Sequence, residues 1–330
     1  MKLMATCCPG LEFVLEKEIQ DTLGVHAQAE RGKAFFDAEP ETAKALRCAD
    51  NLHAWVDEVR IGPTRPDLPD FARALEPLPV KDVLRGLRGV SAERIHVTAS
   101  RAGRHSYSRF EASAAALPAL CKAAGGEPGD ESRHTCAFRL DIVDDHCRVY
   151  IKLTPPEFRF RGARDFSPAA LRPTIAHALV LLTEPTPKDV FLDPFCGSGT
   201  LLAERMSLPH AAVLGGDIDP TAIQAASVNA RGYSVQQWDA TALPLEDASI
   251  SAVATNPPWG KQIAIADETR LYGGFIAELR RVCRKGARIV VLTDRKEALL
   301  TACAYVGWNA EQLATLSLHG TLAGVFRIMA

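Results

Sequence analysis

The first sixty residues alternate between hydrophobic patterns of two periods. Residues 2–8 and 52–62 show the alternation of strands, and residues 11–24 repeat apolar side chains at the spacing of an amphipathic helix. Between them, residues 26–38 are typical of a hairpin and residues 41–48 of a second helix. The resulting order of strand, helix, two strands, helix and strand predicts a small ferredoxin-like module.

A second small α/β unit follows residues 62–71, a stretch with three prolines that indicates a linker. Residues 94–102 have the pattern of a strand that enters a basic loop, and residues 108–126 that of a helix. Residues 135–154 predict two strands with a turn between them, and residues 155–182 predict a basic connector and then another helix.

From Lys188 onward, strands and helices alternate strictly. This alternation predicts a doubly wound, mostly parallel sheet of the Rossmann-like type, which binds ligands at the carboxyl ends of its strands. Residues 310–330 predict two further strands that turn at His319-Gly320 and close the sheet as a hairpin. The five predicted strands before them are 189–193, 211–217, 233–239, 250–256 and 287–293.

The chain is therefore expected to be an α/β protein with a Rossmann-like C-terminal domain and two smaller N-terminal domains. The expected boundaries are 1–65 for the ferredoxin-like domain, 66–155 for the second small domain, 156–187 for a linker and leading helix, and 188–330 for the Rossmann-like domain.

Composition agrees with a soluble globular protein. Of the 330 residues, 47% are hydrophobic and 24% are charged, and no apolar run is long enough to span a bilayer. Nine cysteines without metal-ligand spacing indicate reduced thiols and a cytoplasmic location. The nearest approach to a metal cluster is Cys136 and Cys147 with His134 and His146, which we interpret as strand and loop residues, so no metal is expected.

Charge is distributed unevenly along the chain. The net charge is −2, but residues 81–109 contain seven Lys or Arg against two acids, and residues 148–172 contain six against two. Such segments fit a nucleic-acid-binding surface or an ordinary solvated face, and the charges alone leave both open.

The first polar strand end begins the sequence DPFCGSGT at Asp193. Its two glycines, Gly197 and Gly199, allow the backbone to approach a ligand closely. A dinucleotide fingerprint would need a third glycine where Leu202 stands, and a phosphate-binding loop would need a lysine. A tight turn is the alternative interpretation of this loop when it is taken alone.

Two further strands end in acids. Asp217 could accept hydrogen bonds from two ribose hydroxyls, and Asp239 could accept one from an adenine amine. Together with Asp193 they suit an adenosine-containing ligand that lacks a diphosphate, and S-adenosylmethionine is the common cofactor of that kind. Each acid alone could instead cap a helix or a turn.

The fourth strand end is the sequence TNPPWG, residues 255–260. The two prolines hold the backbone stiffly and lack N–H groups, so their neighbourhood offers carbonyl acceptors. Asn256 adds a side-chain carbonyl, and Trp259 adds a face on which a base could stack. Two acceptors and an aromatic ring suit the planar amine of a nucleobase, although a proline turn with a packed tryptophan is the simpler alternative.

DPFCGSGT and NPPWG, in this order on one predicted sheet, resemble the first and fourth motifs of class I S-adenosylmethionine-dependent methyltransferases that act on exocyclic amines. Residues 171–180 resemble the helix that such enzymes place before the first motif. The upstream half resembles a ferredoxin-like module followed by a THUMP domain, an RNA-binding unit of tRNA-modifying enzymes. Over essentially the whole chain, the combination is similar to the THUMP-containing guanine-N2 methyltransferases, notably the group that modifies guanine 6 of the tRNA acceptor stem.

This resemblance implies roles by position. The residues expected to bind the cofactor are Asp193, Pro194, Cys196, Gly197, Ser198, Gly199, Thr200, Asp217, Ile218, Asp239, Ala240 and Asn256. The catalytic residues are expected to be Asn256, Pro257, Pro258 and Trp259, with Cys196 as a loop residue and not a nucleophile. The expected RNA contacts are Arg101, Arg104, His105, Arg109, Arg159, Arg161 and Arg164.

The expected partner is the acceptor stem and 3′ end of a tRNA, bound by a monomer that is not associated with a membrane. Guanine 10 of tRNA, a guanine of rRNA and the N6 amine of adenine remain alternative targets. A protein that binds RNA without catalysis is the alternative from another functional class, although the intact set of polar strand ends argues against it.

Overall fold

The computed structural model describes residues 1–161, 170–229, 234–259, 267–318 and 320–330, and these form two compact units. Unit 1 consists of Met1–Thr6, Ile19–Leu46 and Asn51–Pro156. Unit 2 consists of Cys7–Glu18, Arg47–Asp50 and Glu157–Ala330. Two short segments of the N-terminal fifty residues therefore belong to the same compact unit as the C-terminal half.

Unit 1 is built on one eight-stranded sheet with the strand order β2-β3-β1-β4-β8-β7-β5-β6. The central pairing joins β4 to β8 in antiparallel register, so strands from both predicted N-terminal domains share a sheet. The strands are β1 (Lys2–Thr6), β2 (Gln28–Glu30), β3 (Lys33–Asp37), β4 (Asn51–Arg60), β5 (Arg94–Ala102), β6 (Glu127–Pro128), β7 (Cys136–Val143) and β8 (His146–Lys152).

The three helices predicted for the N-terminal half are present, and the structure adds two short helices between the second and the third that the pattern does not predict. They are α1 (Glu12–Leu23), α2 (Pro40–Ala43), α3 (Leu68–Leu75), α4 (Val80–Arg85) and α5 (Arg109–Ala124). The predicted linker contains a 3-10 turn, Arg65–Asp67, and the start of α3. Two of its three prolines, Pro66 and Pro69, lie in first turns, where a missing N–H costs no helical hydrogen bond. Phe71 is buried, so the segment is structured.

Unit 2 contains a seven-stranded sheet with the order β11-β10-β9-β12-β13-β15-β14. The first five strands are parallel and the last two form an antiparallel hairpin, which confirms the predicted doubly wound sheet with a closing hairpin. The strands are β9 (Val190–Asp193), β10 (Ala212–Asp217), β11 (Ser234–Gln237), β12 (Ile250–Thr255), β13 (Cys283–Thr293), β14 (Asn309–Leu318) and β15 (Thr321–Met329). The predicted turn residue His319 lies outside the described residues.

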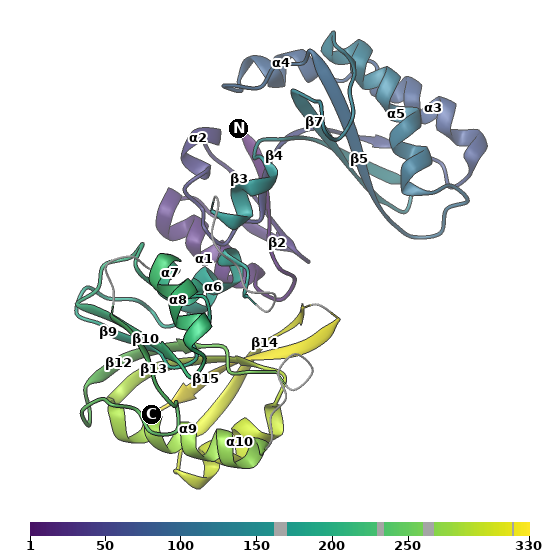
Figure 1. Ribbon diagram of the computed structural model, residues 1–330. Helices are drawn as coiled ribbons and strands as arrows, with labels where there is room; N and C mark the ends of the chain where they lie inside the picture. Colours follow the sequence, from purple (N-terminus) through teal and green to yellow (C-terminus); the bar gives the residue numbers. More distant parts are fainter. Residues whose placement is uncertain (162–169, 230–233, 260–266, 319) are drawn as a thin grey trace. The chain divides into compact units, whose positions relative to one another are not determined.

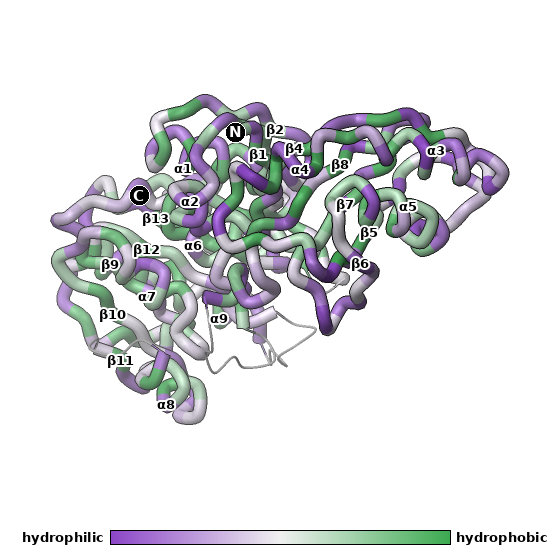
Figure 2. The backbone as a smooth tube through the Cα atoms, turned by 90° about the horizontal axis from the view of Figure 1, so that it is seen from above, coloured by the Kyte–Doolittle hydropathy of each residue, from purple (hydrophilic) through white to green (hydrophobic). Residues whose placement is uncertain are grey.

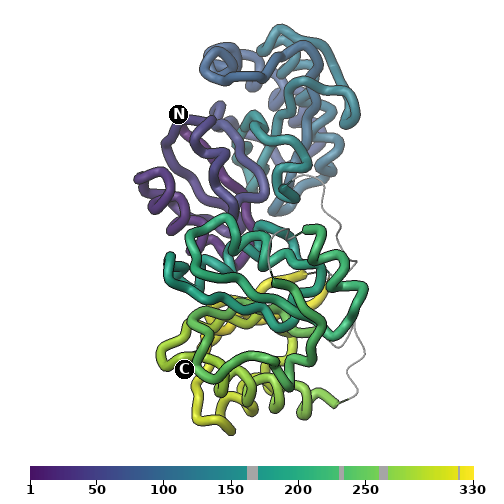
Figure 3. Tube along the Cα trace, turned by 60° about the vertical axis from the view of Figure 1, so that its left-hand side comes forward, coloured from purple at the N-terminus to yellow at the C-terminus, as the bar shows by residue number. Residues whose placement is uncertain are grey.

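Helices cover both faces of this sheet. One layer holds α6 (Pro173–Leu181), α7 (Thr200–Arg205) and α8 (Pro220–Asn229), and the other holds α9 (Glu268–Val282) and α10 (Lys296–Tyr305) (Figure 1). Figure 3 shows the same two layers from another side. Helix α9 ends at Val282, because Cys283 pairs with Ile250 and already belongs to β13.

The central strands of the sheet form the core of unit 2. Ala252 to Thr255 of β12 and Ile289 to Thr293 of β13 are buried, as expected for parallel strands covered on both faces. Hydrophobic stretches, green in Figure 2, run through the strands of each sheet. The polar residues that end β9 and β10, and the one that follows β12, therefore lie at the carboxyl edge of a rigid apolar sheet.

Three further findings concern membrane spans, metal ligands and cysteine thiols. Across the described part of the chain, no helix combines the length and hydrophobicity needed to cross a bilayer. Among the same residues, no group of three or more His, Cys, Asp or Glu side chains is arranged to hold a metal ion. Each of the nine cysteines is a buried, free thiol.

Candidate active site

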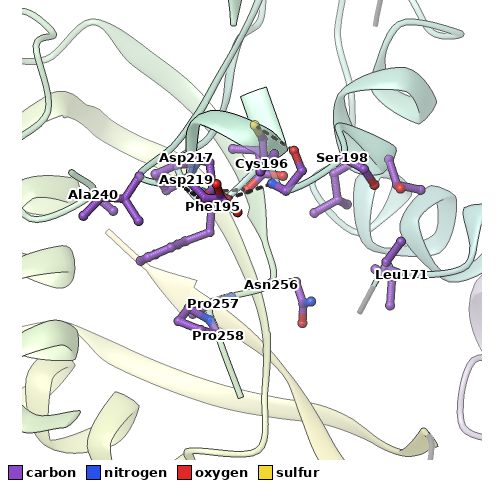
Figure 4. Close-up of a pocket in the computed structure, with 18 of the residues that line it drawn as sticks. Leu171, Phe195, Cys196, Ser198, Asp217, Asp219, Ala240, Asn256, Pro257 and Pro258 are labelled. Carbon is purple, nitrogen blue, oxygen red and sulfur yellow. Dashed lines mark hydrogen bonds between the residues drawn. The ribbon is translucent and has the colours of Figure 1, made fainter. Parts of the chain in front are cut away.

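A pocket of about 510 Å³ opens at the carboxyl ends of β9, β10 and β12, within unit 2. Asn256, Pro257 and Pro258 lie on one side of it, and Cys196 and Ser198 lie on the other (Figure 4). The pocket includes every predicted cofactor-binding residue except Gly199, which lies within the same loop. Its lining residues are Ala170, Leu171, Asp193, Pro194, Phe195, Cys196, Gly197, Ser198, Thr200, Leu201, Asp217, Ile218, Asp219, Ala222, Asp239, Ala240, Asn256, Pro257, Pro258, Trp259 and Leu271.

The glycine loop is a tight turn between β9 and α7 that backbone hydrogen bonds hold in place. Its backbone is held by hydrogen bonds from the Cys196 N–H to the Gly216 carbonyl at 2.9 Å and from the Gly199 N–H to the Cys196 carbonyl at 2.8 Å. Gly197 and Gly199 have φ angles of 51° and 80°, a region that other residues rarely adopt. The loop therefore brings its backbone close to the pocket without side chains in the way.

Cys196 occupies this loop as a neutral thiol. Its side chain is buried, and burial raises the pKa of the thiol well above its usual value, with the nearby Asp193 and Asp217 carboxylates adding to the effect. A thiolate is required for nucleophilic attack, so the geometry disfavours a covalent role for this cysteine.

Asp193 is the most unusual acid of the pocket. The residue is 1% exposed, and its Oδ1 accepts hydrogen bonds from the Thr255 hydroxyl at 2.7 Å and the Phe195 N–H at 3.2 Å. Its Oδ2 is buried and has no hydrogen-bond partner among the described residues. Burial raises the pKa of Asp193 to about 7 although both hydrogen bonds oppose the rise. A bound cation or N–H donor would satisfy this oxygen.

Asp217 and Asp239 also line the pocket, and each carboxylate already accepts hydrogen bonds from nearby loop residues. Asp217 accepts the Gly197 N–H at 3.0 Å and the Asp219 N–H at 3.1 Å. Asp239, two residues beyond the end of β11, accepts the Thr241 N–H at 2.8 Å and hydroxyl at 2.7 Å through one oxygen. Because a carboxylate offers about four lone-pair sites, these bonds leave capacity for ligand hydroxyls or an amine.

The NPPW segment, residues 256–259, lines the side of the pocket opposite the glycine loop. Asn256 follows the last residue of β12 and is half-buried, whereas Trp259 is only 5% exposed. The indole Nε1–H of Trp259 donates a hydrogen bond to the side-chain Oδ1 of Asn256 at 2.9 Å. The predicted amine acceptor and the predicted aromatic residue are thus joined to each other across the two prolines.

Sequence reasoning missed some of the residues at the site. Phe195, Leu201, Ala222 and Leu271 line the pocket as apolar side chains, which have no distinguishing motif of their own. Thr255 has no role in the interpretation of the TNPPWG segment, although its hydroxyl holds Asp193. A single hydroxyl at the buried end of an apolar strand is the signal that could have drawn attention to it.

The predicted RNA-contacting residues fall into both units. Arg101, Arg104 and Arg109 are exposed in unit 1, and Arg101 donates to the main-chain carbonyl of His105 at 3.2 Å. His105 lies 2.6 Å from the carbonyl of Asp144.

In unit 2, Arg159 is half-buried, with its guanidinium over the ring of Phe160. Arg161 donates to the main-chain carbonyls of Phe158 and Arg47, so its guanidinium is engaged internally. Arg164 lies outside the described residues.

Fold and pocket together define the C-terminal half as a class I methyltransferase domain. Residues 161–323 match the family model for the RMKL-like methyltransferase domain. Residues 2–50 match the model for the RlmL ferredoxin-like domain. Both matches agree with the predicted fold class.

Relatives and solved structures extend the likeness to the whole chain. The chain is 29% identical over 339 residues to a tRNA (guanine(6)-N2)-methyltransferase of Thermus thermophilus, covering 99% of this chain and 98% of the relative. It superposes on the crystal structure of TrmN from Thermus thermophilus with a TM-score of 0.82 at 26% identity, covering 99% of both chains.

It is also 29% identical over 260 residues to the tRNA (guanine(6)-N(2))-methyltransferase THUMP3 of Mus musculus, covering 71% of this chain and 51% of the relative. The chain thus spans about half the length of that mouse relative. These findings confirm the resemblance to THUMP-containing guanine-N2 methyltransferases.

Proposed function

We propose that this protein transfers a methyl group from S-adenosylmethionine to the exocyclic N2 amine of a guanine in tRNA. One observation carries the proposal: a single pocket places Asn256, at the end of β12, opposite the glycine loop and the acids that end β9 and β10. This arrangement supplies acceptors for a base amine beside a site suited to an adenosine-containing methyl donor.

Each polar part of S-adenosylmethionine would meet a suitable residue of the pocket. The unpartnered Oδ2 of Asp193 would accept a hydrogen bond from the ammonium of the methionine end, near the backbone of Gly197 and Ser198. Asp217 would hold the ribose hydroxyls, and Asp239 would accept from the adenine amine. When bound, the cofactor would supply an electrophilic methyl group on a sulfonium.

Asn256 would act on the amine of the guanine. Its Oδ1 and the Pro257 carbonyl would accept the two amine hydrogens, which favours a pyramidal nitrogen with an available lone pair. The amine held in this way would receive the methyl group that the cofactor supplies, with the S–CH₃ bond broken as the N–CH₃ bond forms, and it would then release one proton to water. The amine needs no strong base in the protein, because it becomes acidic only as it gains the methyl group.

The specific target proposed is guanine 6 of the acceptor stem, supported by the names of the Thermus thermophilus and mouse relatives described above. A paired guanine must leave the stack to reach the pocket, at a cost of a few kcal/mol. The N-terminal domains would hold the tRNA near its 3′ end and set the distance to the target. The residues proposed to contact RNA are Arg101, Arg104, His105, Arg109, Arg159 and Arg164, with Arg161 a less suitable candidate because of its internal bonds.

A methyl-transfer assay tests this function. Purified protein, S-adenosylmethionine and unmodified total tRNA should yield N2-methylguanosine, and nuclease mapping should place it at position 6. N2-methylguanosine at another position would refute the proposed target, and N6-methyladenosine would refute the guanine assignment. Failure to bind the cofactor in calorimetry would favour an RNA-binding protein without catalysis.

Replacement of Asn256 tests the mechanism directly. Asn256→Ala should lower kcat by at least about a thousandfold, because an acceptor needed only in the transition state is lost, equivalent to roughly 4 kcal/mol. The affinity for S-adenosylmethionine, measured by calorimetry, should change by less than about threefold. A large loss of cofactor affinity would instead place Asn256 in cofactor binding.

A further inference from the structure

Trp259 is expected to offer a ring face for a base to stack on, but the residue is buried and its indole N–H makes a hydrogen bond. Its side chain is 5% exposed, and its Nε1–H donates to Asn256 Oδ1 at 2.9 Å. Within the described residues this is the one hydrogen bond made by the Asn256 side chain. Between the two, Pro257 and Pro258 restrict the backbone, so the separation of the two side chains is held by a stiff connection.

The direction of this bond matters because a carboxamide has two ends of nearly equal shape and opposite hydrogen-bond character. The oxygen end accepts two hydrogen bonds and the NH₂ end donates two, whereas an indole N–H can only donate. Rotation of the Asn256 amide by half a turn would set its NH₂ against the indole N–H and break the bond. It would also direct donors at the amine of a guanine, which itself presents two N–H groups.

We propose that Trp259 is a positioning residue that selects the reactive orientation of the Asn256 amide through its indole N–H. This inference rests on the proposed amine methylation and adds a role that the aromatic ring alone cannot perform. The indole occupies one lone pair of Oδ1, and the other lone pair stays available for an amine hydrogen of the substrate.

A double-mutant cycle isolates this role. Trp259→Phe keeps an aromatic ring and removes the N–H, and we expect it to lower kcat by about tenfold with little change in the KM for tRNA, the size expected for one buried hydrogen bond. In Asn256→Asp both side-chain oxygens accept, so orientation no longer matters. In that background Trp259→Phe should change kcat by less than about twofold, because the two substitutions no longer interact.

Trp238 provides the matched control. Its indole is also buried, 7% exposed, and its Nε1–H donates to the main-chain carbonyl of Pro194 at 3.4 Å, away from Asn256. Trp238→Phe should therefore change kcat by the same factor with Asn or Asp at position 256. Equal losses from Trp259→Phe in both backgrounds would overturn the positioning role and leave only a packing role.

A spectroscopic measurement tests the hydrogen bond without any assay of activity. The chain has four tryptophans, so a ¹⁵N-labelled sample gives a small set of indole N–H signals, and Trp259→Phe assigns one of them. Asn256→Ala should shift that signal and speed its exchange with water, while the Trp238 signal stays in place. An unmoved Trp259 signal would overturn the proposal. An enzyme that shows the expected shift but methylates no tRNA would instead refute the proposed function.

Discussion

Two of the groups of buried charged side chains in unit 2 differ in how completely the protein satisfies their carboxylates. In the first group, Glu204 is fully buried and accepts hydrogen bonds from the Arg47 guanidinium at 2.6 and 3.0 Å. His177 lies between Glu204, at 3.2 Å, and Glu18, at 3.5 Å. Glu18 in turn accepts the Arg47 N–H at 2.6 Å. Both carboxylates of this network face donors supplied by the protein.

The second group is the pocket, where Asp193 has one oxygen without a partner among the described residues. The pKa values reflect the difference. Burial opposes ionisation of Glu204, but His177 and Arg47 outweigh it and lower its pKa. Burial dominates at Asp193 and raises its pKa to about 7. A buried carboxylate whose charge is balanced by partners in the protein has a structural role. One that lacks a partner and lies beside a cavity is suited to bind a ligand.

The largest expected effect comes from breaking the network. Glu204→Gln leaves the Arg47 guanidinium facing a neutral amide, and the free energy of unfolding should fall by about 3 kcal/mol, as for other buried pairs that lose one partner. Urea denaturation measures the change. A loss below about 0.5 kcal/mol, as for an ordinary surface substitution, would show that the network is not structural.

The equivalent neutralisation in the pocket should act on binding and spare stability. In Asp193→Asn the remaining carbonyl oxygen can still accept from Thr255 and Phe195, so the free energy of unfolding should change by less than about 1 kcal/mol. The affinity for S-adenosylmethionine should fall by about tenfold to a hundredfold, because a charge-assisted hydrogen bond is lost. Calorimetric titration and urea denaturation of the same sample separate the two effects. If Asp193→Asn lowered the free energy of unfolding as much as Glu204→Gln does, the proposed difference between a binding carboxylate and a structural one would be wrong.

The smallest expected effect is a pH dependence of cofactor binding. Asp193 is largely protonated below its pKa of about 7, and an ammonium ligand binds the ionised form. Affinity should therefore fall by about tenfold when the pH drops from 7.5 to 6, since each unit below the pKa removes up to tenfold of the ionised form. Asp193→Asn should show no such dependence over the same range, and a wild-type affinity that is flat with pH would contradict the assigned role.

The same pKa has an opposite consequence for stability. A carboxyl group whose pKa is raised by folding keeps a proton that the unfolded chain has already released. Its contribution to the free energy of unfolding is therefore largest below 3.8, the ordinary pKa of an aspartate, and decreases as the pH rises toward about 7. Cofactor binding and the contribution of Asp193 to apoprotein stability should thus move in opposite directions as the pH rises toward about 7.

Much of this architecture could be predicted from sequence because it depends on local pattern. The period of the hydrophobic residues indicated the strands, and the strand ends indicated Asp193, Asp217 and Asn256, which the structure brings to one pocket. Prediction failed where tertiary contacts overrode local composition. Prolines suggested a linker at residues 62–71, yet burial of Phe71 and favourable first-turn positions allow α3 to begin there.

The sequence by itself determined the order of strands and helices, the glycine loop and the amide-proline-proline-tryptophan segment, because each arises from neighbouring residues. Tertiary structure alone decided which polar groups are satisfied. Arg47 meets Glu204 across 157 positions of sequence, whereas the Oδ2 of Asp193 meets no donor in the described chain. The energy of a buried charge depends on the residues that surround it in the folded protein, and the local sequence pattern does not indicate which residues those are.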